Sequence, residues 1–169
     1  PSKYPAAVQL MTAFVANHGK SKEQTVVQAI DALGRMNADM GKLPEAEAAY
    51  LQIKELDEQR ASRLATVIFT AYLTHAENLD KELDAAVSAQ KDKASTDKLK
   101  AELTQVRTRL CNLGVDYMRA SQKPGLGILV NTMGALEKLD DWKKVDEVAK
   151  RALELYGAET EAKTKQVID

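Results

Sequence analysis

The segment ALGRMNADMGKLPEAEAAYLQIKELD, from Ala32 to Asp57, decides the fold. Its two halves have helical composition, and Gly41 followed by Pro44 marks a turn between them. A second glycine, Gly34, lies inside the first half, where glycine costs about 0.5–1 kcal/mol relative to alanine. A helix tolerates this cost where a Cβ would obstruct a neighbouring helix. The segment therefore predicts two antiparallel helices whose backbones approach closely.

The composition of the whole chain is typical of an all-helical protein. Of its 169 residues, 44% are apolar but only 5% are aromatic, so the core must consist mainly of aliphatic side chains. The chain has 8 glycines and 4 prolines, which is few for a protein rich in turns. Apolar residues recur at helical spacing, and no segment alternates between hairpin turns in the manner of a strand. We therefore expect an all-α fold.

The opening segment resembles the tetratricopeptide repeat, a helix-turn-helix unit of about 34 residues with a degenerate pattern of small and large side chains. Leu33 and Gly34 match the Leu-Gly pair of the family's first helix, and Gly41 matches its turn glycine. The family's positions in the second helix are matched by Leu43, Ala46, Tyr50 and Ile53. The resemblance implies a right-handed α-solenoid of antiparallel helical hairpins.

Weaker matches extend this pattern over residues 1–157, which we expect to form a single repeat domain. YPAAVQLMTAF (4–14) has the spacing of a second helix, NLGVDY (112–117) repeats the Leu-Gly-x-x-Tyr pattern, and LDDWKKVDEVAKRALEL (139–155) resembles a turn and a second helix. The expected parts are a partial repeat 1–19, a repeat 22–58, an irregular middle hairpin 60–91 with a break around Asn78, a repeat 95–139 and a capping helix 141–157. Residues 158–169 are expected to be a polar tail or a frayed helix.

The resemblance also implies a binding surface, because first helices line a concave groove that holds a peptide in this family. In the best-matched unit the groove positions are Gln28, Asp31, Arg35, Ala38 and Asp39. In the unit around Gly114 they are Thr108, Cys111, Val115, Met118 and Arg119. Arg35 and Arg119 are the strongest candidates, because arginine can hold a carboxylate through two hydrogen bonds. The alternative is that these are ordinary surface residues.

Catalytic and metal-binding functions have little support in the sequence. HGKS (18–21) resembles the end of a phosphate-binding loop, but Phe14 occupies the position of the loop's first glycine. His18 and His75 are the only histidines and belong to no metal-binding motif. Cys111 lies in a strongly helical segment, where a buried apolar role is expected. We expect no cofactor, no metal and no enzymatic activity.

Charge and hydropathy restrict the partners. The net charge of −1 gives no bulk attraction for nucleic acid, and no apolar run reaches the roughly 20 residues of a membrane span. A basic cluster at Lys98, Lys100, Arg107, Arg109 and Arg119 is either a contact for an acidic partner or a charged outer face. The single cysteine weakly favours a reducing, cytoplasmic compartment.

These patterns favour a noncatalytic scaffold or adaptor that binds a protein or peptide in a concave helical groove. One alternative is a small-ligand-binding or regulatory helical domain with a pocket near Pro124–Val130 or Tyr72. Another is self-association into a homo-oligomer through the first helix, where Val8, Met11 and Phe14 would be uncovered if no repeat precedes them.

Overall fold

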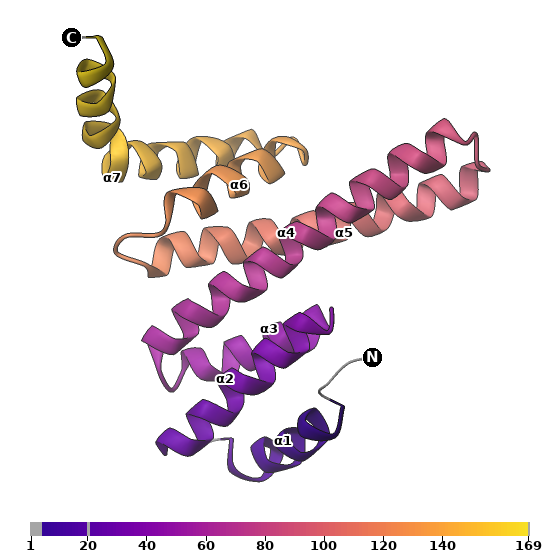
Figure 1. Ribbon diagram of the computed structural model, residues 1–169, viewed down its shortest axis with the longest axis vertical. Coiled ribbons are helices and arrows are strands. Elements are labelled where there is room, and N and C mark those ends of the chain that lie inside the picture. Colours follow the sequence, from indigo (N-terminus) through magenta and orange to yellow (C-terminus); the bar gives the residue numbers. More distant parts are fainter. Residues whose placement is uncertain (1–4, 20, 169) are drawn as a thin grey trace. The chain divides into compact units, whose positions relative to one another are not determined.

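The computed structural model describes the backbone of residues 5–19 and 21–168 and the side chains up to residue 157. Within these residues the chain forms seven helices and no strand, which confirms the all-α class (Figure 1). The helices are α1 (Pro5–His18), α2 (Gln24–Asp39), α3 (Leu43–Lys54), α4 (Glu58–Ser88), α5 (Lys93–Ala120), α6 (Leu126–Glu137) and α7 (Trp142–Ile168).

The contacts within the chain divide it into two compact units, Pro1–His75 and Ala76–Asp169, and α4 contributes to both. The first unit contains α1, α2, α3 and the first part of α4. The second contains the rest of α4 with α5, α6 and α7. The sequence had led us to expect a single domain over residues 1–157.

The turn between α2 and α3 follows from its glycine and proline. Gly41 has φ of 71°, in the left-handed region that glycine adopts at low cost, and the Lys42 amide donates to the Asn37 carbonyl at 2.8 Å. Pro44 lies in the first turn of α3, where its missing N–H is not required by the helix. The two helices therefore form the antiparallel pair that the sequence predicts.

Gly34 lies where three helices of the first unit meet. A Cβ at this position would be 2.7 Å from Leu64 Cδ2 on α4 and 3.1 Å from Ala49 Cβ on α3. Both distances are shorter than ordinary carbon contacts, so only glycine fits without displacing a neighbour. The prediction of a close approach at Gly34 is confirmed. The fully buried core around it includes Ile30, Ala46, Ile53, Leu64 and Ile68.

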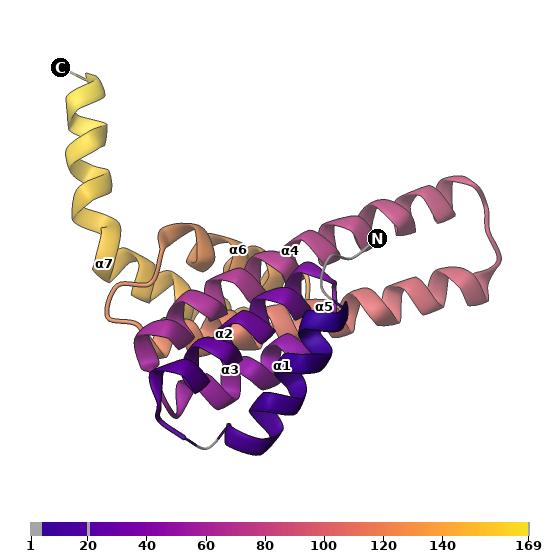
Figure 2. The same cartoon turned by 60° about the horizontal axis from the view of Figure 1, so that its bottom comes forward.

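Helix α1 packs on α2 (Figure 2). A side chain from α3 also fixes the end of α1. The Gln52 amide Nε2 donates to the Gly19 carbonyl at 2.9 Å. A Cβ on Gly19 would be only 2.2 Å from that same Nε2. The glycine therefore makes room for the amide that holds the α1–α2 connection.

The expected break near Asn78 is wrong, because α4 continues through it to Ser88. Buried Ala76, Leu79 and Ala86 keep helical spacing across this position, and no glycine or proline interrupts the helix. A single asparagine lowers helix propensity by less than about 1 kcal/mol, which is too little to end a helix with a buried stripe. The chain turns only after α4, where Gln90 has φ of 51°.

The last part of α4 and the first part of α5 form an antiparallel arm in the second unit. Its tip extends beyond α6 and α7 (Figures 1 and 2). Asp92 caps α5 by accepting a hydrogen bond from the Ser95 amide at 2.9 Å. Leu79 and Ala86 of α4, together with Leu103 and Val106 of α5, are the buried residues of this part of the unit.

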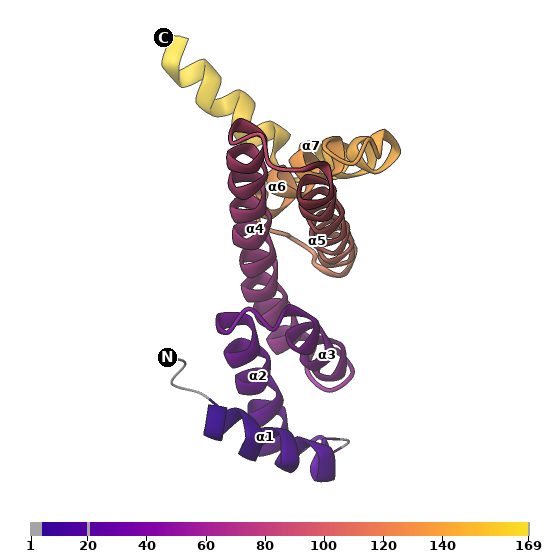
Figure 3. The ribbon, with the colours of Figure 1, turned by 90° about the vertical axis from the view of Figure 1, so that its right-hand side faces the viewer.

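Helix α6 lies beside both α5 and α7 (Figure 3). Its start is tied to α7 because the Tyr156 hydroxyl donates to the Pro124 carbonyl at 2.7 Å. Leu129, Leu136 and Val148 are fully buried between these helices. Helix α7 continues to Ile168, so its backbone includes most of the segment for which we expected a polar tail or a frayed helix; Asp169 lies outside the described residues.

Candidate protein-binding surface

One side of α2 carries four of the sequence-predicted site residues. Gln28, Asp31, Arg35 and Asp39 follow at intervals of three or four positions, so they share one helix face. Gln28 and Asp39 are exposed, whereas Asp31 and Arg35 are half-buried. The other side of α2 is buried against its neighbours through Val26, Val27, Ile30, Leu33, Gly34 and Asn37. The structure therefore brings these four polar side chains together on one accessible stripe.

Arg35 is oriented by Asp31 one turn earlier. Arg35 Nε lies 3.1 Å from each carboxylate oxygen of Asp31, and the two side chains are 40% and 15% exposed. The contact uses Nε alone. The two terminal nitrogens of Arg35 have no protein partner among the described residues, so this edge of the guanidinium can accept a carboxylate from another molecule.

The corresponding face of α5 is largely buried. Cys111, Val115 and Met118 are only 2%, 3% and 4% exposed, so a partner cannot reach their side chains in this structure. Met118 was predicted to contact a partner, but it belongs to the core of the second unit. The reason is that the middle of α5 is enclosed over more than half its circumference, with Leu110, Leu113 and Gly114 buried as well. On α2, Ala38 is also buried, at 6% exposure.

Thr108 and Arg119 remain exposed on α5, but both already have partners within the chain. The Thr108 hydroxyl donates to the Thr104 carbonyl at 2.8 Å. Arg119 donates from Nε and from a terminal nitrogen to the two carboxylate oxygens of Glu147, each at 3.0 Å. This bidentate pair joins α5 to α7. An incoming carboxylate would have to displace Glu147, so Arg119 is a weaker candidate than Arg35.

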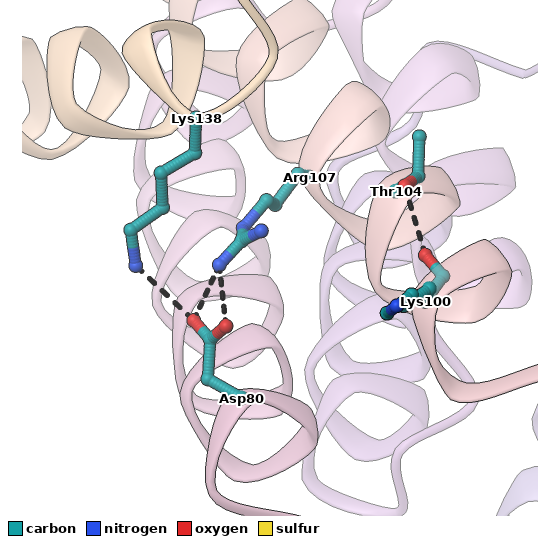
Figure 4. Close-up of polar contacts among 5 residues, drawn as sticks. All are labelled: Asp80, Lys100, Thr104, Arg107 and Lys138. Atoms are coloured by element: carbon teal, nitrogen blue, oxygen red, sulfur yellow. Dashed lines mark hydrogen bonds and ion pairs between the residues drawn. The ribbon is translucent and has the colours of Figure 1, made fainter. Parts of the chain in front are cut away.

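A second ion cluster joins three segments of the second unit (Figure 4). A terminal nitrogen of Arg107 on α5 donates to Asp80 on α4 at 2.6 Å, and Lys138 Nζ, just after α6, donates to the same carboxylate at 3.1 Å. Partial burial raises the pKa of Asp80, but the hydrogen bonds and positive charges of Arg107 and Lys138 outweigh it, and the pKa falls below its usual 3.8. The cluster is a structural tie between helices.

These pairs change the interpretation of the basic cluster predicted on α5. Arg107 and Arg119 are neutralised by Asp80 and Glu147, so neither presents an unpaired charge to an acidic partner. Figure 4 also shows Lys100 near Thr104, whose hydroxyl donates to the Lys100 carbonyl at 2.8 Å. Sequence reasoning missed both ion pairs, because 27 or 28 positions separate the partners and no local pattern connects them.

The single cysteine and the two histidines have structural surroundings. Burial raises the pKa of the Cys111 thiol to about 11, so it stays protonated at neutral pH and is a poor nucleophile. The ring of His18 lies 5.0 Å from that of Phe14, and His75 is half-buried on α4. In the part of the chain that the structure describes, no three His, Cys, Asp or Glu side chains gather into a group that could hold a metal ion.

Comparison of the chain with protein-family models, curated proteins and solved structures found no match. Among the described helices, none has both the length and the apolar character needed to cross a membrane.

The polar face of α2, with Arg35 held by Asp31, is the accessible part of the predicted site in the first unit. Thr108 and Arg119 are its accessible part in the second.

Proposed function

We propose that this chain is a tetratricopeptide-like, right-handed α-solenoid that acts as a noncatalytic scaffold or adaptor. In this proposal a peptide or a partner protein binds in a concave groove lined by the polar face of α2. Two features support the architecture. In the described part of the chain, the pairs α1–α2, α2–α3, α5–α6 and α6–α7 pack extensively, and each joins consecutive helices, as in repeat proteins. Gly34 also provides the close helix contact that the resemblance requires.

The observation that carries the binding proposal is the Asp31–Arg35 pair. Asp31 is largely buried and holds Arg35 through Nε, which reduces the rotamer freedom that the arginine would lose on binding. The remaining edge of the guanidinium can then form two parallel hydrogen bonds with a carboxylate. The expected ligand is therefore a peptide with an acidic side chain or a terminal carboxylate, with Gln28 and Asp39 as neighbouring hydrogen-bonding groups.

A peptide-display selection tests this proposal. Random peptides would be selected on the immobilised full chain, and enriched peptides would then be labelled for fluorescence anisotropy. We expect the enriched peptides to share a carboxylate, and Arg35→Ala to raise their Kd at least about tenfold, because hydrogen bonds to charged groups contribute about 1.5–3 kcal/mol. Arg119→Ala should raise it less, since Glu147 already occupies that guanidinium.

The matched control is Arg63→Ala, which removes an exposed arginine from α4 within residues 1–75. It should leave the peptide Kd unchanged. The proposal fails if no peptide is enriched, or if the enriched peptides bind Arg35→Ala and Arg63→Ala with the affinity of the original chain. The first result would count against a peptide-binding role, and the second would count against the α2 face as its location.

The alternative of a ligand pocket near Pro124–Val130 or Tyr72 stays a prediction from the sequence. Tyr72 is buried at 2% exposure, and the Pro124 carbonyl accepts the Tyr156 hydroxyl. Leu126 and Val130 are 44% and 51% exposed on the outer side of α6. These two side chains therefore form part of an exterior surface.

A further inference from the structure

Arg35 lies between two aspartates on the polar face of α2. Asp31 precedes it by four positions and Asp39 follows it by four, so the three side chains lie on one side of the helix. Arg35 bonds to Asp31 through Nε. In a helix, an acidic residue four positions before a basic one pairs better than an acidic residue four positions after it. This preference explains why Arg35 pairs with Asp31 and leaves Asp39 without an arginine.

Asp39 therefore presents an open carboxylate at the end of this face. Its side chain is exposed, and no hydrogen bond or ion pair links it to another described residue. Lys42, three positions later and beyond the left-handed Gly41, is exposed and forms no ion pair with it. Because a helix rises about 1.5 Å per residue, Arg35 and Asp39 are separated by about 6 Å along the axis. The face thus offers an open guanidinium edge and an open carboxylate one turn apart.

The balance of charge on this face disfavours a ligand that is only acidic. One arginine and two aspartates give the face a net charge of −1. A carboxylate bound to Arg35 would bring the total to −2 and would be repelled by Asp39 one turn away. A ligand that also places a cation on Asp39 keeps the total at −1 and replaces this repulsion with an attraction. The face is therefore complementary to a ligand that carries both charges.

We propose that the α2 face recognises a dipolar peptide segment, in which an acidic side chain binds Arg35 and a basic side chain binds Asp39. This inference rests on the proposed function and specifies its ligand. In an extended peptide, side chains two positions apart point to the same side and are about 6.6 Å apart, close to the helical rise of about 6 Å between the two sites. The expected ligand is an extended Glu-x-Lys segment, or Lys-x-Glu bound in the opposite direction.

The peptides selected on the full chain test this spacing. We expect the enriched peptides to contain an acidic and a basic residue two positions apart. Exchanging the basic residue with its neighbour keeps the composition and the net charge of the peptide, but moves the cation to the other side of an extended chain. Fluorescence anisotropy at low salt, where screening is weak, should show that this exchange raises the Kd at least about threefold.

Reversing one charge on each side gives the sharper result. For the original chain, replacing the basic residue of the peptide with glutamate should raise the Kd at least about threefold. For Asp39→Lys the same replacement should lower the Kd, because the ion pair is formed again with opposite signs. The matched control is Glu55→Lys, which changes the net charge equally at the end of α3, outside the α2 face. With this control the glutamate peptide should stay the weaker ligand.

Both lysine variants should fold, because a cation near the C-terminal end of a helix is favourable, and circular dichroism checks this. If Asp39→Lys loses helix, Asp39→Asn replaces it and should reduce the difference in Kd between the lysine peptide and the glutamate peptide.

The outcomes distinguish this inference from the proposed function. Peptides that require Arg35 but keep the same preference for lysine over glutamate with Asp39→Lys overturn the dipolar ligand and leave the carboxylate site intact. Equal Kd values for the two positions of the basic residue also overturn the dipolar ligand. Peptides whose Kd is unchanged by Arg35→Ala, or a selection that enriches no peptide, overturn both proposals.

Discussion

The α2–α3 pair and the α6–α7 pair are both antiparallel helical hairpins, but they use glycine in opposite ways. In α2, Gly34 faces Leu64 and Ala49 at distances that leave no room for a methyl group. In α6, Gly134 faces open space. The same residue type inside a helix therefore marks a completed contact in one unit and an unfilled surface in the other.

The first helices of these two pairs, α2 and α6, also differ in the polarity of their exposed faces. Helix α2 combines a buried apolar side with the exposed polar stripe that contains Asp31 and Arg35. Helix α6 buries Leu129 and Leu136 but leaves Leu126 and Val130 exposed. A polar stripe is stable in water and able to bind a polar ligand, whereas exposed apolar side chains such as Leu126 and Val130 are stabilised when they are covered. The comparison teaches that the two units offer different kinds of surface.

The largest effect is expected from Gly34→Ala. The added methyl must displace Leu64 and press on Ala49, and overpacking of this kind costs about 1–3 kcal/mol, more than the gain in helix propensity of at most about 1 kcal/mol. Urea unfolding followed by circular dichroism should show a net loss of stability. In a Leu64→Ala background the loss should shrink, because the space is then available. A more stable Gly34→Ala chain would contradict the close contact.

Asp80→Asn is expected to have the next largest effect on stability. It leaves Arg107, which is only 14% exposed, without its carboxylate and also removes the partner of Lys138. We expect a loss of at most about 1 kcal/mol in the free energy of unfolding, reduced from the buried case by the partial exposure of Asp80. Asp146→Asn is the control, because its pair with Lys150 is largely exposed. Equal stability of both variants would rule out a structural role for the cluster.

The loss of stability caused by Asp80→Asn should depend on pH, whereas the loss caused by Gly34→Ala should not. The pKa of Asp80 is lowered in the folded chain, so its ion pairs stabilise the protein above the unfolded value of 3.8, and the stabilisation is lost as the pH falls through the folded pKa. The difference in unfolding free energy between the original chain and Asp80→Asn should thus shrink from pH 7 to below about pH 4. Urea titrations at both pH values measure it. A constant difference would exclude an electrostatic origin.

The smallest effect, and one of opposite sign, is expected from Gly134→Ala. The new Cβ meets no atom within 4 Å, so the substitution should stabilise the second unit by about 0.5–1 kcal/mol through helix propensity alone. Urea unfolding followed by circular dichroism provides the measurement. Destabilisation comparable to that of Gly34→Ala would remove the distinction between the two glycines.

Much of the local structure was predictable from short sequence patterns. Gly41 and Pro44 predicted the α2–α3 turn, because a left-handed residue and a proline are required there by backbone geometry alone. Gly34 predicted a close helix contact, because glycine inside a helix needs a packing reason. The prediction of a break at Asn78 was wrong, because the burial of Leu79 and Ala86 outweighed the weak helix preference of asparagine.

The site was predictable only in part, because exposure depends on which helices become neighbours. The spacing from Gln28 to Asp39 placed four side chains on one face of α2, and that face is accessible. The same reasoning applied to α5 placed Met118 in a groove, but the neighbours of α5 bury it. The partners of Arg107 and Arg119 come from other helices and lie too far away in sequence for any spacing rule to identify them.

The spacing of apolar residues in the arm formed by α4 and α5 restricts how the length of the arm can change. Leu79, Leu83 and Ala86 on α4 are spaced by four and three positions, and Leu99, Leu103 and Val106 on α5 repeat the same spacing. This is the interval of a coiled coil, in which each residue added to one helix rotates the following side chains by about 100°. Viable insertions or deletions in the arm should therefore come as matched heptads in both helices, so that relatives of this chain would carry arms of stepwise different reach.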